Sequence, residues 1–157
     1  MKQKAIIVDI DGTLTRDPLL INDKSREGRD VFYQKIDEYL RVKRELIKPV
    51  VNLIQLIFNY SNIKIIFLTA REDRYDIKEN TIKFLENKIL CDCDYCSFDL
   101  YMREENDLRL NYEVKEQILK EEILPFYDVL FALDDEDENV EMFRRNGILV
   151  LQVKDVK

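Results

Sequence analysis

The chain has 157 residues, of which 46% are hydrophobic, and its 32 acidic and 25 basic residues give a net charge of −7. This length and composition suit a globular fold and exclude a disordered chain, and no apolar run approaches the about 20 residues of a membrane span. The acidic balance argues against broad, sequence-independent binding to a phosphate backbone, but it is compatible with a local basic pocket.

Predicted strands and helices alternate along the chain. Apolar runs predict strands at Ala5–Ile10, Ile63–Thr69, Phe98–Met102, Asp128–Leu133 and Ile148–Val153. Helical spacing predicts one or two helices within 30–59, where Pro49 suits a first turn, and single helices over 73–89, 113–124 and 137–146, the last ending at Gly147. This alternation predicts an α/β fold with a single doubly wound, Rossmann-like, mostly parallel sheet flanked by helices, whose ligand site lies outside the carboxyl ends of the strands.

Composition also limits the chemistry. The chain has no histidine, so acid–base chemistry must come from carboxylates, lysine, tyrosine or cysteine, and metal ligands must be mainly oxygen or sulfur. Its three cysteines, Cys91, Cys93 and Cys96, could hold Zn²⁺, but a fourth ligand is missing and reduced thiols are the expected state. We find no signal peptide, repeat or linker, and we expect one cytoplasmic domain over residues 1–157.

Two aspartates follow the first predicted strand. Asp9 and Asp11 are one residue apart, so their side chains face the same side of an extended chain, and Gly12 allows a sharp turn after them. An Asp/Gly turn after a strand is common without any function. Adjacent carboxylates nevertheless repel each other unless a cation or a shared proton compensates them, and for all-oxygen ligands Mg²⁺ is the expected cation.

Polar residues near the ends of other predicted elements fit the same chemistry. Thr69 and Arg71 come at the end of the second strand, and Lys115 lies in the first turn of a predicted helix. A hydroxyl, a guanidinium and an ammonium at such places are good phosphate donors. Asp134 and Asp135 follow the fourth strand and add carboxylates. Together these residues indicate Mg²⁺-dependent phosphoryl transfer.

The stretches DIDGTLT and LTAR, Lys115 and the stretch LDDEDEN occur in the order of the four motifs of the haloacid dehalogenase superfamily of phosphohydrolases, which nearly the whole chain resembles. The resemblance implies that Asp9 is a nucleophile that forms an aspartyl-phosphate. It implies that Asp11 protonates the leaving group and then activates water, a role that favours a phosphatase over a dehalogenase. Thr69 and Lys115 would hold the phosphoryl oxygens. Asp134 would complete the Mg²⁺ site with an Asp9 oxygen and the Asp11 backbone carbonyl.

Residues 63–153 are also similar to the 3′-phosphatase domain of phage polynucleotide kinase and its stand-alone relatives, which remove 3′-phosphates from nucleic acid ends during repair. The likeness lies in LTAREDRYDIKENTIKFL, LYMREENDLRLNYEVKEQIL and FALDDEDENVEMFRRNGILVLQV. It implies that Arg71, Arg103 and Arg109 bind substrate, although most charged loop residues are simply solvated. Arg74 could join them or be a surface residue.

The likeness weakens between Leu14 and Lys48. Residues 15–48 could form a small helical cap but not a full cap domain, and such an open site suits a polymer end. The substrate arginine expected soon after DGT could be any of three residues, namely Arg16, Arg26 and Arg29. Asn111 stands where an acid is expected, so this position could mark a changed substrate.

The fourth motif leaves the supporting metal residue open. Asp135, Asp137 and Glu138 are the alternatives, and adjacency to Asp134 favours Asp135, which we expect to join Asp9, Asp11 and Asp134 at the metal site. The other acids of this run suit the N-terminus of a helix.

We therefore expect a Mg²⁺-dependent phosphatase that acts on nucleic acid 3′-phosphate ends. One alternative is a phosphatase for nucleotides or sugar phosphates, which the acidic net charge favours. Another is a non-catalytic module working beside a separate kinase or ligase, which the complete motif set argues against. We expect no membrane partner.

Overall fold

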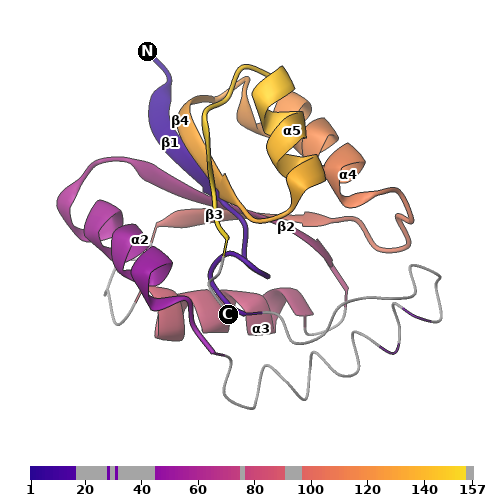
Figure 1. Ribbon diagram of the computed structural model, residues 1–157, viewed down its shortest axis with the longest axis horizontal. Helices are drawn as coiled ribbons and strands as arrows, with labels where there is room; N and C mark the ends of the chain where they lie inside the picture. Colours follow the sequence, from indigo (N-terminus) through magenta and orange to yellow (C-terminus); the bar gives the residue numbers. More distant parts are fainter. Residues whose placement is uncertain (17–27, 29–30, 32–44, 75–76, 91–96, 155–157) are drawn as a thin grey trace.

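The computed structural model describes residues 1–16, 28, 31, 45–74, 77–90 and 97–154. Its strands form one five-stranded sheet in which every neighbouring pair is parallel (Figure 1). The order is β3-β2-β1-β4-β5. The strands are β1 (Gln3–Val8), β2 (Lys64–Glu72), β3 (Phe98–Arg103), β4 (Tyr127–Asp134) and β5 (Val150–Gln152). This sheet confirms the predicted doubly wound α/β fold.

Helices cover both faces of the sheet (Figure 1). One face carries α2 (Lys48–Tyr60) and α3 (Ile77–Phe84), the latter continuing into a π-helical turn, η1 (Leu85–Ile89). The other face carries α4 (Asn111–Ile118), which continues into a second π-helical turn, η2 (Leu119–Ile123), and α5 (Asp137–Arg145). Two buried apolar layers result, one on each face, because the side chains of each parallel strand alternate between the two faces.

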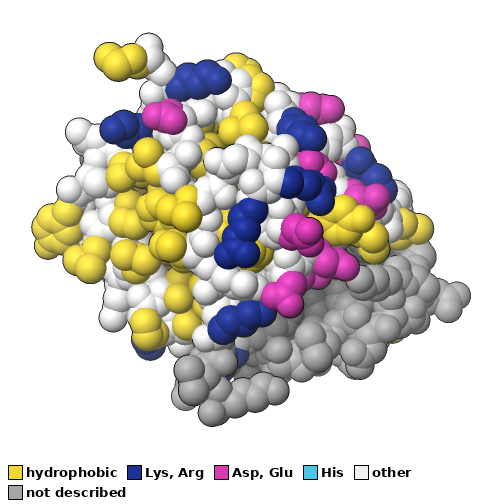
Figure 2. Space-filling model, turned by 45° about the horizontal axis from the view of Figure 1, so that its top comes forward, with side chains coloured by type: hydrophobic (Ala, Val, Ile, Leu, Met, Phe, Trp, Pro, Cys, Tyr) yellow, Lys and Arg dark blue, Asp and Glu magenta, His cyan; other side chains and the backbone are white. Residues whose placement is uncertain are grey.

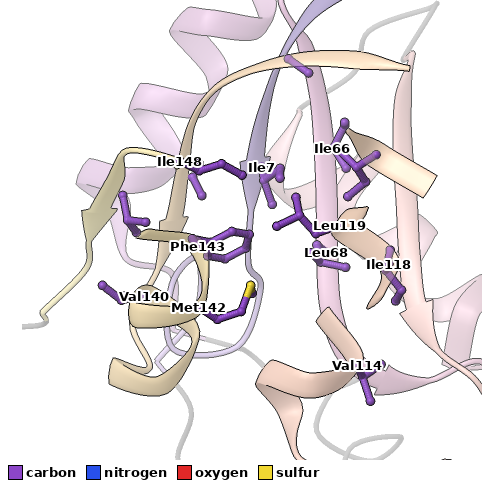
Figure 3. Close-up of a cluster of buried hydrophobic side chains, with 14 residues drawn as sticks. Ile7, Ile66, Leu68, Val114, Ile118, Leu119, Val140, Met142, Phe143 and Ile148 are labelled. Atoms are coloured by element: carbon purple, nitrogen blue, oxygen red, sulfur yellow. The ribbon is translucent and has the colours of Figure 1, made fainter. Parts of the chain in front are cut away.

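The core beneath α4 and α5 holds these two helices against the sheet. Figure 3 shows Ile7 of β1 and Ile66 of β2 meeting Leu119, Met142 and Phe143 from the helical side. On the other face, the second cluster includes Ile6 and Val8 of β1 together with Val51 and Ile54 of α2. β1 is therefore covered on both faces, which explains its continuous apolar sequence.

Two local signals in the sequence work as predicted. Pro49 lies in the first turn of α2, where its missing N–H costs no helical hydrogen bond. Gly147 follows α5 with a φ of +79°, in the left-handed region that favours glycine.

Two predicted boundaries next to the site, at the end of β2 and the start of α3, were wrong. β2 continues to Glu72 rather than ending at Thr69, because Glu72 pairs with Arg103 of β3 after a shift in register that follows Leu68. The next helix consequently begins at Ile77 and not at 73. Strand-like pairing thus carries Thr69 and Arg71 within β2 instead of leaving them beyond its end.

The order of strands creates the switch point at which ligands bind in this class of fold. β1 lies between β2 and β4, and Val8 pairs with Phe67 on one side and with Leu133 on the other. The backbone N–H of Asp9 donates to the Leu133 carbonyl at 2.9 Å, so Asp9 and Asp134 leave adjacent strands side by side.

Several predicted features lie outside the described residues. These are the three cysteines, Arg26, Arg29 and most of the segment 15–48 that was predicted to form a small cap. Among the residues that are described, no helix combines the length and apolar character that a membrane crossing requires. On the face shown in Figure 2, Lys and Arg side chains lie among Asp and Glu side chains rather than in a separate basic field.

A charged cluster joins α4 to the end of α5 and generates a pH-dependent prediction. Glu116 accepts hydrogen bonds from Arg145 and from the Asn146 amide, and it pairs with Lys120 at 2.8 Å. The hydrogen bond from Arg145, with those from Asn146 and Lys120, lowers the pKa of Glu116 from 4.5 to about 2. Ionised Glu116 therefore stabilises the fold above pH 4.5, and this contribution is lost as the pH falls towards 2.

We expect Glu116→Gln to lower the free energy of unfolding at pH 7 by about 1 kcal/mol, as for a networked surface ion pair. Urea unfolding between pH 7 and pH 3 should show this difference shrinking below pH 4.5. Glu79→Gln, which removes a single exposed pair with Lys83, should cost less. A difference between wild type and Glu116→Gln that does not change with pH would contradict the assignment.

Candidate active site

A buried lysine joins two aspartates at the carboxyl ends of β1 and β4. The Lys115 ammonium donates to Asp9 Oδ1 and to Asp134 Oδ2, both at 2.7 Å. All three residues are at most 6% exposed. The contact joins a strand end near the start of the chain to a helix and a strand end more than 100 residues later. The three residues that sequence analysis selected independently therefore meet in one place.

Burial and charge act together on this group. Burial raises the pKa of Asp9 well above its usual range, the Lys115 charge opposes this shift, and the charges of Asp134 and Asp135 add to it. Burial alone would lower the pKa of Lys115, but the charges of Asp134 and Asp9 outweigh burial and raise it. Lys115 consequently carries a full positive charge at neutral pH.

The predicted place of Lys115 in its helix was wrong. α4 begins at Asn111, two residues before the predicted start, so Lys115 lies in the second turn. The field of the helix N-terminus falls off within the first turn and does not act on it there. Lys115 reaches the site from the buried side of α4, which it shares with Val114 and Ile118.

Asp135 is the third carboxylate of the site. Asp9, Asp134 and Asp135 each offer an oxygen, and these oxygens all lie within 4.8 Å of one another. The Thr13 hydroxyl donates to Asp135 Oδ1 at 3.1 Å. Burial, with the charge of Asp134, raises the pKa of Asp135 to about 6. Of the three alternatives from the sequence, it is Asp135 that meets Asp9, whereas Asp137 and Glu138 are exposed.

This donor set fits a divalent cation with oxygen ligands. Three carboxylates converge on one point, and Lys115 is the cation that contacts Asp9 and Asp134 among the described residues. Burial is the main cause of the raised pKa values of Asp9 and Asp135, and repulsion among the carboxylates adds to it, because one ammonium offsets only one of three negative charges. A hard cation such as Mg²⁺ would compensate the remaining charge and prefers these ligands.

Arg71 holds the second aspartate of the first motif. Its Nε and Nη2 donate to the two carboxylate oxygens of Asp11, each at 2.6 Å, in a bidentate pair. Nη1 donates to the Thr81 hydroxyl of α3 at 3.0 Å, and Arg71 is 3% exposed. The Thr69 hydroxyl, two residues earlier in β2, accepts the Arg71 backbone N–H. Arg71 thus contacts Asp11 through its guanidinium and Thr69 through its backbone N–H.

Arg103 is fully buried and organises the loop 104–110. Its guanidinium donates to the backbone carbonyls of Ala70 at 3.0 Å, Asp107 at 2.9 Å and Arg109 at 2.7 Å. These bonds favour a positioning role for Arg103, while the substrate contact implied by its sequence stays a prediction. Arg109 itself is exposed and pairs with the Asp107 carboxylate at 2.6 Å.

Arg74, for which sequence analysis left two readings open, is not a surface residue. It is 6% exposed, and its Nε lies 3.6 Å from a carboxylate oxygen of the fully buried Glu72. Arg16, one of the three alternatives after DGT, pairs with Glu45 on the surface.

Four residues that support the aspartates were not predicted from the sequence. Thr13 contacts Asp135 and Thr81 contacts Arg71, as described above. The other two are Asn139, whose amide donates to Asp134 Oδ1 at 3.1 Å, and Glu136, which accepts from the same amide at 3.0 Å. A signal for Asn139 was present, since it is a polar residue on the otherwise apolar buried side of α5.

A comparison with protein families decides the family of this chain. The model of the polynucleotide kinase PNKP phosphatase domain, from the haloacid dehalogenase superfamily, matches residues 3–157. The chain belongs to this family. The match confirms the predicted superfamily, the likeness to the polynucleotide kinase 3′-phosphatase and the expectation of a phosphatase.

Solved structures agree with the assignment of this phosphatase domain. Two structures of a Pnkp1/Rnl/Hen1 complex, one described as an RNA repair complex, share 29% identity with it. Their TM-scores are 0.70 and 0.67, and they cover 97% of this chain. This chain spans 42% and 46% of the chains that it matches there.

A more distant likeness concerns the fold alone. The HAD domain of the effector protein Lem4 from Legionella pneumophila matches with 16% identity and a TM-score of 0.52. That match covers 98% of this chain and 86% of the other chain.

Two glycines with similar backbone angles provide a test of how tightly Asp135 is seated. Gly12 has a φ of +88°, and a Cβ added to it would lie 2.2 Å from Asp135 Oδ2. Gly147 has a φ of +79°, and a Cβ there would meet nothing within 4 Å. Gly147→Ala therefore tests the backbone conformation alone, and Gly12→Ala adds displacement of the carboxylate.

We expect Gly147→Ala to cost about 1 kcal/mol of unfolding free energy and to leave phosphatase activity within about twofold of wild type. Gly12→Ala should cost at least about 1 kcal/mol more and lower kcat by about tenfold, because Asp135 must leave its place. Urea unfolding and phosphate release measure the two effects. Equal activity of both variants would show that Asp135 can move without consequence.

Proposed function

We propose that this phosphatase domain removes 3′-phosphates from nucleic acid ends in a Mg²⁺-dependent reaction through an aspartyl-phosphate on Asp9. The observation that carries the proposal is the buried contact of Lys115 with Asp9 and Asp134, beside Asp135, at the switch point of the sheet. In the proposed reaction, that group would supply a nucleophile, a cation for the transferring phosphoryl group and a set of metal ligands.

Asp9, Asp134 and Asp135 would hold the Mg²⁺ ion, with the backbone carbonyl of Asp11 as a further oxygen ligand. When bound, the ion would supply positive charge for the carboxylates and for the phosphoryl oxygens. The raised pKa of Asp9 supports this requirement, since a nucleophilic carboxylate must be ionised and a cation beside it favours ionisation.

The first chemical step transfers the phosphoryl group to the protein. An Asp9 carboxylate oxygen attacks phosphorus, the bond from phosphorus to the 3′-oxygen breaks, and protonated Asp11 gives its proton to the departing oxygen. Lys115 and Thr69 hold the phosphoryl oxygens and stabilise the negative charge that develops on these oxygens. The products of this step are a free 3′-hydroxyl, an aspartyl-phosphate and an ionised Asp11.

The second step returns the site to its starting state. Ionised Asp11 takes a proton from water, the water oxygen attacks phosphorus, and the bond from phosphorus to Asp9 breaks to release inorganic phosphate. The bidentate pair with Arg71 orients Asp11 and favours its ionised form, which is the form that this step needs. A substrate phosphate beside Arg71 would compete with Asp11 for the guanidinium and so free Asp11 to hold its proton in the first step.

The substrate is proposed to be a nucleic acid end rather than a small metabolite. The family match supports a nucleic acid end, and the likeness to a chain of an RNA repair complex supports RNA in particular. The exposed Arg109, on the loop that follows β3, is proposed to contact the phosphate backbone next to the end. A separate repair enzyme, such as a kinase or ligase, is the proposed partner. The acidic net charge supports the alternative, a nucleotide or sugar phosphatase.

Phosphate release from four substrates tests the proposal. These are an RNA and a DNA oligonucleotide with a 3′-phosphate, a 3′-mononucleotide and an aryl phosphate, each with Mg²⁺ and with a chelator. We expect activity only with Mg²⁺, a kcat/KM for an oligonucleotide at least about tenfold above that for the mononucleotide, and no activity in Asp9→Asn. Equal or better turnover of the small substrates would be compatible with the proposed mechanism but would contradict the proposal of a nucleic acid substrate.

Arg109→Gln tests the proposed backbone contact separately. We expect it to raise the KM for the 3′-phosphorylated oligonucleotide by about fivefold and to lower the slope of log KM against log salt by about 1. Arg144→Gln removes the same charge at the last turn of α5, away from Asp134, and should leave both quantities unchanged. Equal effects of the two variants would mean that Arg109 acts only through net charge.

A further inference from the structure

A chain of hydrogen bonds runs from Asp134, one of the proposed metal ligands, to Arg103 and the loop after β3, and Asn111 is its central link. The Asn111 Nδ2 group donates to Glu136 Oε2 at 3.2 Å. The same Glu136 oxygen accepts from the Asn139 amide at 3.0 Å, and that amide also donates to Asp134 Oδ1 at 3.1 Å. On its other side, Asn111 Oδ1 accepts from Arg103 Nη2 at 2.8 Å.

The far end of this chain is the buried guanidinium that shapes the loop 104–110. Arg103 is fully buried, and one of its nitrogens donates to the carbonyls of both Asp107 and Arg109. Asn106, in the same loop, has a positive φ of 68°, so the loop makes a tight turn around the guanidinium. The same side chain that fixes this loop is therefore linked to Asp134.

The chemistry at position 111 requires a group that both accepts and donates. Arg103 can only donate, and the Glu136 carboxylate can only accept, so the orientation of the Asn111 amide is determined. An aspartate there would still accept from Arg103. It would offer no donor to Glu136 and would place two carboxylates against each other.

We infer that Asn111 is a positioning residue of the phosphatase reaction. It holds Glu136 and, through Asn139, fixes the carboxylate of Asp134. It also accepts from Arg103 and so fixes the position of the loop 104–110 relative to the site. The inference deepens the proposed function and rests on it. It also assigns a reason to the amide at a position where the sequence suggested an acid, since Glu136 already supplies the carboxylate of the pair.

Reversing the hydrogen bond tests this inference. We expect Asn111→Asp to lower kcat by about tenfold or more with KM within about twofold, as for residues that orient a metal ligand. In the wild type Asn111 and Asn139 both donate to Glu136 Oε2. The double variant N111D/E136Q therefore restores a donor when the amide at 136 turns its nitrogen to the new carboxylate at 111 and its oxygen to Asn139. Its kcat should return to within about threefold of wild type. Glu136→Gln alone is the remaining variant of this double-mutant cycle, and it should not raise kcat.

Asn146 provides a matched control on the same pair of helices. Its amide donates to the Glu116 carboxylate at 2.9 Å, at the end of α5 away from Asp134. Asn146→Asp therefore makes the same chemical change between α4 and α5 without touching the chain that leads to Asp134. It should lower the unfolding temperature at least as much as Asn111→Asp does and leave kcat unchanged.

Mg²⁺ binding measured by calorimetry gives a second readout that needs no turnover. Asn111→Asp should weaken Mg²⁺ binding by about tenfold, and N111D/E136Q should restore it. If the wild type binds Mg²⁺ but releases no phosphate, the proposed function fails while the Mg²⁺ affinities still decide the role of Asn111. Wild-type kcat and Mg²⁺ affinity in Asn111→Asp, or a double variant as impaired as Asn111→Asp alone, would overturn the inference.

Discussion

The structure depends on compensating negative charge that the fold has buried. Asp9 and Asp134 have almost no contact with water, and a carboxylate in such a place costs several kcal/mol unless a partner offsets it. Lys115 is that partner, at 2.7 Å from each. Because these residues come from β1, β4 and α4, the charge balance is satisfied only when the sheet has its observed order. The strand order and the assembly of the site therefore depend on each other. A sheet with β4 in another place would separate Lys115 from Asp9 and Asp134.

The sequence predicted those parts of the structure that follow from short-range pattern. Continuous apolar runs located β1 and β4 because both faces of a parallel sheet are covered, and Gly147 located the end of α5. The aspartates of the site could be chosen because they follow such runs directly. Pattern was insufficient where long-range pairing decides the structure, as at Glu72, which belongs to β2 only because Arg103 lies opposite it.

The supporting residues were harder to predict than the acids that they support. Asn139 and Glu136 lie within a run of acids that reads as ordinary charge at a helix N-terminus. Their importance comes from contacts with Asp134 and Asn111, and the contact between positions 111 and 136 cannot be read from either segment alone. The same holds for the hydrogen bonds of the buried Arg103 guanidinium to backbone carbonyls, which the sequence did not indicate, while the substrate contact implied by the resemblance stays a prediction.

The strand order also has a consequence for how the chain is made. As synthesis proceeds from the N-terminus, β1 can pair with β2 soon after residue 72 has emerged, but its other neighbour ends at residue 134. Throughout that interval, one edge of β1, formed by Ala5, Ile6, Ile7 and Val8, has open backbone donors and acceptors. Pairing at this edge must wait for a contact between segments about 120 residues apart, which makes folding slow and the nascent chain prone to association. The central strand of the sheet is thus an exposed edge until β4 has been made.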